Sequence, residues 1–118
     1  MKTILIAEDT DSNYLLLSIV LRKKYNLVRA HNGQQAVELY HSDKPDIILM
    51  DIKMPIMDGL DATREIRKTN SVIPIIALTA NAFDSDRQKA KEVGCNGYMA
   101  KPIVTADLLK LLEEHLGE

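Results

Sequence analysis

Carboxylate side chains stand directly after two short apolar segments of the sequence. Glu8 and Asp9 follow the apolar residues 4–7, and Asp51 follows the apolar residues 47–50. If these segments are neighbouring strands, the three carboxylates crowd together, which raises the energy of their charged forms unless a cation compensates. A hard divalent cation accepts carboxylate and carbonyl oxygens, so Mg²⁺ fits such a group and Mn²⁺ is a second candidate. These residues therefore predict a cation site.

A lysine and a threonine stand after two further apolar segments. Lys101 follows residues 97–100 and precedes Pro102, and Thr79 follows residues 75–78. Either residue alone would be an ordinary side chain at a strand end. Their occurrence together with the acids, each just after an apolar segment, indicates one shared site in which Lys101 pairs with the carboxylates.

Such a site suits the chemistry of a phosphoryl group. A carboxylate among cation-binding acids can act as a nucleophile, and attack of an aspartate on phosphorus gives an acyl phosphate. The phosphoryl oxygens carry charge that cations and hydrogen-bond donors must stabilise. The cation, Lys101, the Thr79 hydroxyl and backbone N–H groups after Asp51 would supply that stabilisation. The acids of the first loop, Glu8 and Asp9, would hold the cation.

The segments between these residues predict the elements that bring them together. Five short apolar runs, at residues 4–7, 27–30, 47–50, 75–78 and 97–100, alternate with segments of helical length. In those segments apolar residues recur every three or four positions. Five strands alternating with five helices indicate an α/β fold, a doubly wound parallel sheet of the (βα)5 type covered on both faces, because parallel strands need long crossover connections.

The polarity of the runs predicts the order of the strands. The runs at 4–7, 47–50 and 75–78 are continuously apolar, as central strands covered on both faces must be. The run that contains Arg29 and the short run that begins with Gly97 therefore belong at the edges. With right-handed crossovers this gives the order 2-1-3-4-5, whose winding reverses between strands 1 and 3. Ligands bind at such a reversal, and the acids stand there.

Some residues near the ends of the predicted helices are expected to begin or end a helix rather than to take part in a site. Asp11 or Ser12 is expected to cap a helix, Asp11 is not expected to bind a cation, and Asp58 is expected to be a turn or cap residue before Gly59. Gly94 is expected to close a helix.

Length and composition limit the classes of protein that remain. The chain has 118 residues, 46% of them hydrophobic and 27% charged, which predicts one domain over residues 1–118. The formal net charge of −2 argues against a nucleic-acid binder with a basic face. The single cysteine, Cys95, cannot form an intrachain disulfide, and no apolar run is long enough for a membrane helix or a signal peptide. We therefore expect a cytoplasmic protein.

Four short motifs occur at characteristic spacings. They are the acidic pair at residues 8–9, the stretch DIKMPIMDG at 51–59, the segment ALTA at 77–80 and the sequence YMAKP at 98–102. Together they resemble the receiver domains of response regulators in two-component signalling, and the resemblance covers essentially the whole chain. It is of the chemotaxis-regulator type and is closest in motif style to receivers of hybrid sensor kinases. It implies a flavodoxin-like, three-layer α/β/α arrangement.

The resemblance implies roles in phosphoryl transfer. Asp51 would be the phosphoacceptor, and Thr79 and Lys101 would contact the phosphoryl group. The peptide bond between Lys101 and Pro102 would be cis, a form whose free-energy cost is small only before a proline.

The resemblance also implies a cation site and control of the phosphoryl lifetime. Glu8 and Asp9 would hold Mg²⁺ together with Asp51 and the backbone carbonyl of Lys53. The positions of Lys53 and Asn81 vary among receivers and affect how long the phosphoryl group persists. If the Lys53 side chain lies over the phosphoryl group, it alters attack by water.

A switch and its partners follow from the same resemblance. Phosphorylation would draw Thr79 toward the phosphoryl group and turn Tyr98 from an outward to an inward rotamer. This reshapes the face formed by the fourth helix, the fifth strand and the fifth helix. A histidine kinase or a histidine phosphotransfer protein would donate the phosphoryl group, and a downstream protein would bind that face, which could also form a homodimer. No direct contact with nucleic acid or membrane is expected.

Several alternatives remain open from the sequence. The chain could be a stand-alone regulator or a module excised from a hybrid kinase, and it would catalyse its own phosphorylation and dephosphorylation without turning over a small-molecule substrate. A protein-interaction module that is not phosphorylated is an alternative of a different class. A flavin or nucleotide carrier would need a phosphate-cradling loop where Glu8 and Asp9 stand. A phosphatase with an aspartyl nucleophile would carry an acid where Lys53 stands.

Overall fold

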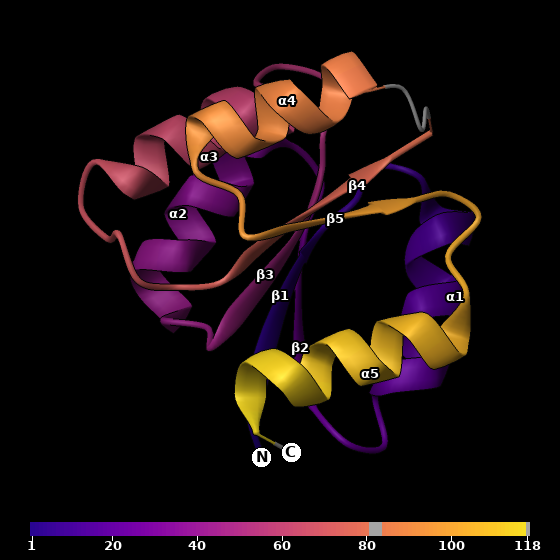
Figure 1. Cartoon of the computed structure of the whole chain (residues 1–118). Helices are drawn as coiled ribbons and strands as arrows, with labels where there is room; N and C mark the ends of the chain where they lie inside the picture. The colour runs from indigo at the N-terminus through magenta and orange to yellow at the C-terminus, as the bar shows by residue number, and fades with distance from the viewer. Residues whose placement is uncertain (81–83, 118) are drawn as a thin grey trace.

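Strands and helices alternate along the described part of the chain, as the apolar runs predict. The computed structural model describes residues 1–80 and 84–117, so Asn81 lies outside the described residues. The elements (Figure 1) are β1 Thr3–Ala7, α1 Asp11–Leu21, β2 Asn26–Ala30, α2 Gly33–Asp43, β3 Ile47–Asp51, α3 Gly59–Arg67, β4 Ile75–Thr79, α4 Asp84–Val93, β5 Gly97–Ala100 and α5 Thr105–Leu116. Each predicted strand is confirmed to within one residue at either end.

The strands form one parallel sheet in the predicted order, β2-β1-β3-β4-β5. Ala7 pairs with Met50, and Asp51 pairs with Leu78, so the carboxyl ends of β1, β3 and β4 lie at one edge of the sheet. β3 and β4 are buried along their whole length, as predicted for central strands. The winding reverses between β1 and β3, and the residues that follow these two strands therefore meet.

Helices cover both faces of the sheet, α1 and α5 on one face and α2, α3 and α4 on the other (Figure 1). Successive side chains of a strand point to opposite faces, and so β1 contributes to two cores. Ile6 belongs to the core cluster of Leu17 in α1 and Leu112 in α5. Leu5 belongs to the cluster of Ile66 in α3. The three-layer α/β/α arrangement is confirmed.

The helix boundaries confirm two expectations and correct one. The Asp58 side chain accepts a hydrogen bond from the backbone N–H of Asp61 at 2.8 Å and caps α3, and Gly94 follows α4 with a φ of 106°. The prediction that Asp11 or Ser12 caps α1 is wrong. Thr10 occupies the cap position, and the Asp11 carboxylate forms an ion pair with Arg29 at 2.8 Å. In the first turn, Asp11 still interacts favourably with the helix dipole.

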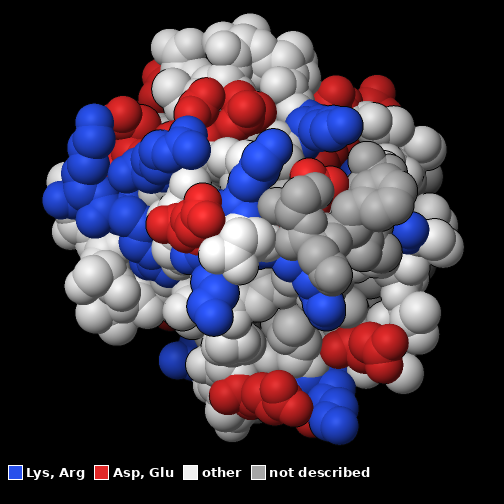
Figure 2. All heavy atoms as spheres, turned by 45° about the horizontal axis from the view of Figure 1, so that its top comes forward, with Lys and Arg blue, Asp and Glu red and all other residues white. Residues whose placement is uncertain are grey.

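The surface carries charges of both signs. In the view of Figure 2, Lys and Arg side chains are interspersed with Asp and Glu side chains. Among residues 1–80 and 84–117, no helix is both long enough and apolar enough to span a bilayer.

Candidate functional site

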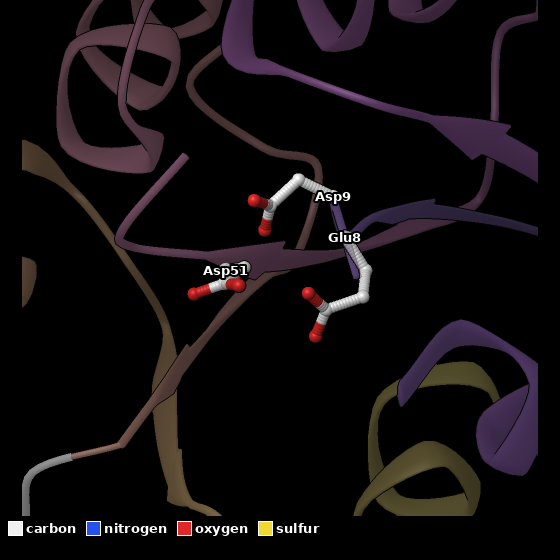
Figure 3. Close-up of side chains that lie close together, drawn as sticks. All are labelled: Glu8, Asp9 and Asp51. Atoms are coloured by element: carbon white, nitrogen blue, oxygen red, sulfur yellow. The ribbon is translucent and has the colours of Figure 1, made fainter. Parts of the chain in front are cut away.

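Three carboxylates gather at the carboxyl edge of the sheet, where β1 and β3 end. One oxygen each of Glu8, Asp9 and Asp51 lies within 4.8 Å of the others, and Figure 3 shows the three side chains converging. Asp51 is the last residue of β3, and Glu8 and Asp9 directly follow β1. Glu8 is 0% exposed and Asp51 is 5% exposed, while Asp9 faces solvent. The predicted meeting of these acids is confirmed.

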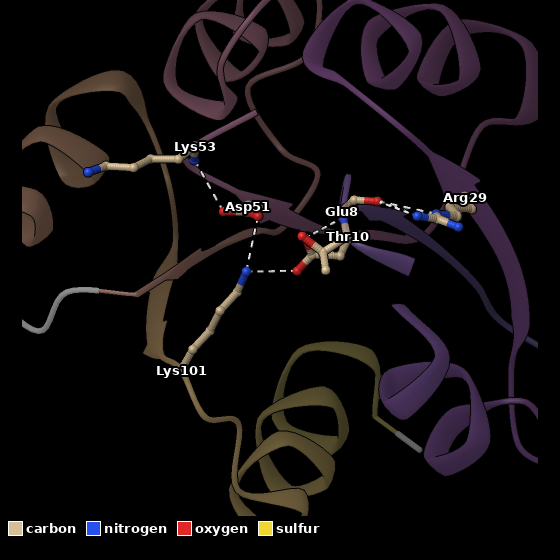
Figure 4. Close-up of polar contacts among 6 residues, drawn as sticks. All are labelled: Glu8, Thr10, Arg29, Asp51, Lys53 and Lys101. Carbon is tan, nitrogen blue, oxygen red and sulfur yellow. Dashed lines mark hydrogen bonds and ion pairs between the residues drawn. The ribbon is translucent and has the colours of Figure 1, made fainter. Parts of the chain in front are cut away.

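Lys101 pairs with two of these acids at once. Its Nζ lies 2.7 Å from Glu8 Oε1 and 3.0 Å from Asp51 Oδ2 (Figure 4). Lys101 follows β5, so its long side chain reaches past the end of β4, and its backbone N–H donates to the carbonyl of Thr79 at 2.7 Å. Its peptide bond to Pro102 is cis, as the resemblance implied. The predicted pairing of Lys101 with the acids is confirmed.

The environment of the pair changes the ionisation of both partners. Burial raises the pKa of Glu8, and the nearby Asp51 adds to this, while the hydrogen bond from Lys101 opposes it. Burial alone would lower the pKa of Lys101, but the hydrogen bonds to Glu8 and Asp51 outweigh it and the pKa is raised. Lys101 is therefore held firmly in its charged form.

The donor set fits a divalent cation. When all groups are ionised, the three carboxylates and the one ammonium leave two negative charges, which a divalent cation would neutralise. Oxygen ligands from carboxylates are those that Mg²⁺ prefers. Both Glu8 oxygens already accept hydrogen bonds, from Lys101 and from the Thr10 backbone N–H at 3.2 Å. Each carboxylate oxygen has a second lone pair, so Glu8 can still serve as a ligand directly or through water.

The sequence reasoning missed Arg29, which holds the loop after β1. Its Nε and Nη2 donate to the carbonyl oxygen of Glu8 at 3.2 and 3.1 Å, and its Nη1 pairs with Asp11 at 2.8 Å. The guanidinium carbon also lies 4.6 Å from the centre of the Tyr14 ring. In the sequence, Arg29 is the single charged residue of the apolar run at 27–30, and it predicted only that this strand lies at an edge of the sheet. In the structure Arg29 anchors the segment that carries Asp9.

The loop after β3 packs closely around Asp51. The Lys53 backbone N–H donates to Asp51 Oδ1 at 3.1 Å, whereas the Lys53 side chain extends away from Asp51 (Figure 4). A Cβ atom at Gly59 would lie 2.1 Å from the carbonyl oxygen of Asp51, so only glycine allows α3 to begin there. Between them, Ile56 adopts a φ of 70°. This strained residue is 79% exposed.

Thr79 and Tyr98 occupy different surroundings. Thr79 is the last residue of β4, is 3% exposed, and stands at the same sheet edge as Asp51. Tyr98 in β5 is half-buried and packs against the cluster of Ile52, Ala77 and Ala90, away from the acids. The Arg87 guanidinium carbon lies 5.2 Å from the centre of its ring. The structure thus gathers the predicted acids, Lys101 and Thr79 at one edge and leaves Tyr98 beside α4.

The sequence matches known proteins along nearly its whole length. The family model of the response regulator receiver domain matches residues 4–113. The polar-differentiation response regulator DivK of Brucella anthropi is 32% identical over 120 residues, which cover 99% of this chain and 98% of that protein. Hybrid signal transduction histidine kinase B of Dictyostelium discoideum is 39% identical over 132 residues, which cover 99% of this chain but only 7% of the kinase.

Solved structures agree with these matches. The receiver domain of the sensor histidine kinase PA1611 from Pseudomonas aeruginosa, solved with a magnesium ion in its active-site cleft, has a TM-score of 0.92 and 39% identity, covering 99% of this chain and 98% of that one. The receiver domain of the Saccharomyces cerevisiae response regulator Ssk1, solved with the histidine phosphotransfer protein Ypd1, has a TM-score of 0.90 and 32% identity, covering 97% and 88%. The chain therefore belongs to the response regulator receiver domain family, the receiver modules of two-component phosphorelay signalling.

Proposed function

We propose that Asp51 is the phosphoacceptor of this receiver and takes its phosphoryl group from a phosphohistidine. One observation carries the assignment: the Asp51 carboxylate lies at the reversal of the sheet, with Lys101 Nζ at 3.0 Å and the other acids within 4.8 Å. The donor would be a histidine kinase or a histidine phosphotransfer protein, as the complex of the related Ssk1 receiver with Ypd1 suggests.

The transfer is an in-line displacement at phosphorus. An oxygen of the Asp51 carboxylate attacks the phosphorus atom and forms a P–O bond, while the P–N bond to the donor histidine breaks. The bonding electrons go to the imidazole nitrogen, and the ring leaves as neutral imidazole because its other nitrogen carries a proton. The product is an acyl phosphate. Water can later attack the same phosphorus, which releases inorganic phosphate and restores the carboxylate.

The surrounding groups stabilise the charge on the transferred oxygens. Lys101 holds its ammonium beside Asp51, and we assign the Thr79 hydroxyl and the Lys53 backbone N–H as further donors. Mg²⁺, with Mn²⁺ as a second candidate, would be held by Glu8, Asp9, Asp51 and the carbonyl of Lys53. When bound, it supplies positive charge against the phosphoryl oxygens. Lys53 and Asn81 are the proposed determinants of phosphoryl lifetime.

The outer face of α1 is the proposed docking surface for the phosphoryl donor. Leu17 and Leu21 of this helix are buried in the core, yet three large apolar side chains on its other side are exposed: Leu15 at 55%, Leu16 at 66% and Ile19 at 49%. A helix that is apolar on both sides normally has its outer side covered by a partner. Because α1 begins two residues after Asp9, a helical donor bound there would stand beside Asp51.

A second surface would transmit the signal. We propose that phosphorylation draws Thr79 toward the phosphoryl group and moves Tyr98 inward, which changes the face of α4, β5 and α5. The Tyr98 ring is partly buried and has the Arg87 guanidinium carbon 5.2 Å from its centre, so a change of its rotamer would alter this face. A downstream protein, or a second copy of the chain, would bind there.

Intact mass measurement after incubation with acetyl phosphate and Mg²⁺ tests the assignment. The wild type should gain one phosphate adduct, and the Asp51→Asn variant should gain none. Asp61→Asn, which changes an exposed acid of α3, is the matched control and should keep the adduct. An adduct that survives in Asp51→Asn, or a wild type that gains no adduct from several donors, would overturn the assignment. The second outcome would favour the alternative of an interaction module that is not phosphorylated.

A further inference from the structure

A cavity lies between α1 and α5, directly beside the acid cluster. Its volume is about 200 Å³, and its lining comes from Glu8, α1, the end of β4, the segment that joins β5 to α5, and the first turns of α5. Leu17, Leu78 and Leu108 form its buried apolar wall. Engineered apolar cavities of about 150 Å³ bind benzene, so this space is large enough for an aromatic ring.

The cavity shares two of its lining residues with the proposed phosphoryl site. Glu8 and Lys101 line it, and their carboxylate and ammonium groups are joined at 2.7 Å. A molecule in the cavity would therefore touch the side chains that place the Lys101 ammonium beside Asp51. The Glu8–Lys101 pair therefore connects the cavity to the proposed phosphoryl site at Asp51.

The lining also indicates the chemical class of the occupant. Most of the wall is apolar, and the two charged groups that line it, those of Lys101 and Glu8, are already paired with each other. A charged ligand would disturb that pair, so an uncharged ligand is favoured. Asn13, which is partly buried, and Thr105, which is exposed, also line the cavity with polar side chains. They can bind one polar group of a ligand.

We propose that this cavity binds a small uncharged aromatic molecule with one hydrogen-bonding group, and that its occupancy slows phosphoryl uptake at Asp51. The binding itself does not depend on the proposed function, whereas the effect on uptake rests on it. An occupant that shifts the Lys101 side chain would move its ammonium away from Asp51, and the charge stabilisation it offers would weaken.

Indole is a suitable probe because it is uncharged, bicyclic and carries one N–H donor. Amide chemical shifts of the full chain, recorded with Mg²⁺ during an indole titration, should change saturably at residues that line the cavity. Leu16→Trp places a large side chain at the rim of the cavity and should weaken indole binding by at least about tenfold. Leu15→Trp is the matched control, since Leu15 lies on the same helix, is similarly exposed and does not line the cavity. It should keep the wild-type affinity within about twofold.

Acetyl phosphate uptake with saturating indole tests the coupling. Indole should lower the rate of phosphate uptake severalfold in the wild type and should leave the rate of the Leu16→Trp variant unchanged. The binding proposal is overturned if indole shows no saturable shifts, if the shifts are confined to α1 residues that do not line the cavity, such as Leu15 and Ile19, or if both variants bind equally. Saturable binding without any change in rate would overturn the coupling. A wild type that takes up no phosphate even without indole would instead contradict the proposed function.

Discussion

The guanidinium group of Arg29 donates two hydrogen bonds, from Nε at 3.2 Å and from Nη2 at 3.1 Å, to the main-chain carbonyl oxygen of Glu8. The third nitrogen pairs with the Asp11 carboxylate. An edge strand thus holds the loop from which two of the three acids project. The position of the proposed cation site therefore depends on Arg29, which contacts Glu8 only at its main-chain carbonyl and touches none of the three carboxylates.

We expect Arg29→Met to lower the free energy of unfolding by about 1–3 kcal/mol, because a partly buried carbonyl loses its donors. Mg²⁺ affinity should fall as well, since the loop is no longer anchored. Urea denaturation followed by circular dichroism, and a Mg²⁺ titration, measure the two effects. Arg22→Met changes an exposed arginine of similar size and should stay within about 0.5 kcal/mol of wild type. Equal effects of both changes would contradict the anchoring role.

Lys101→Met should lower the rate of phosphate uptake by about 10²-fold, because a charged donor beside the transferred oxygens is removed. The rate of adduct formation from acetyl phosphate measures this, and circular dichroism checks that the variant is folded. Lys110→Met on α5 is the control, since Lys110 is exposed and belongs to a different surface. A Lys101→Met rate close to wild type would remove Lys101 from the proposed mechanism.

Glu8→Gln should change how stability depends on pH. Burial raises the pKa of Glu8 above its ordinary value of 4.5 in the folded protein. As pH rises above 4.5, the unfolded chain releases this proton first, and the wild type loses stability until the pH passes the folded pKa. The difference in free energy of unfolding, variant minus wild type, should therefore increase over that window and then level off.

Chemical denaturation at a series of pH values, with a chelator to exclude divalent cations, measures this difference. Glu38→Gln, which removes an exposed carboxylate of α2, is the matched control for the loss of one acidic group. A difference for Glu8→Gln that falls as pH rises would have the wrong sign for a buried carboxylate.

Ile56→Gly should stabilise the protein by about 0.5–1 kcal/mol. A β-branched residue with a φ of 70° carries strain of about 1–2 kcal/mol, part of which is offset by the greater freedom of glycine in the unfolded chain. Val72→Gly is the matched control, because Val72 is also β-branched and exposed but has no positive φ. It should destabilise the protein by about 0.5–1 kcal/mol. Midpoints of urea denaturation compare the two, and a loss of stability in both would rule out strain at Ile56.

Lys53→Ala tests control of the phosphoryl lifetime. The Lys53 side chain is exposed and extends away from Asp51 in the structure, so it must change rotamer to lie over a phosphoryl group. If it does so, it obstructs water, and the alanine variant should lose phosphate severalfold faster. Decay of the adduct after removal of acetyl phosphate measures the rate. Identical decay rates of the phosphate adduct in the two proteins would contradict the proposed role of Lys53.

Local patterns were sufficient to predict the framework of this protein. Runs of apolar residues mark strands because a strand covered on both faces must be apolar throughout, and the 3-to-4 spacing marks helices for an equally local reason. The strand order followed from polarity and handedness, and with it the meeting of Glu8, Asp9 and Asp51. Lys101 was predictable as their partner because it also follows a strand.

The contacts that position these groups depended on the tertiary structure. Arg29 and Glu8 are 21 residues apart, and Lys101 and Glu8 are 93 residues apart, so their pairing distances follow from strand register and packing rather than from any local pattern. The same is true of Asp11, whose carboxylate pairs with Arg29 and does not cap α1. The sequence by itself determined which chemical groups reach the carboxyl edge of the sheet. The tertiary structure decided which of them are buried, which are paired, and that a cavity lies beside them, because burial and distance are properties of the packed chain.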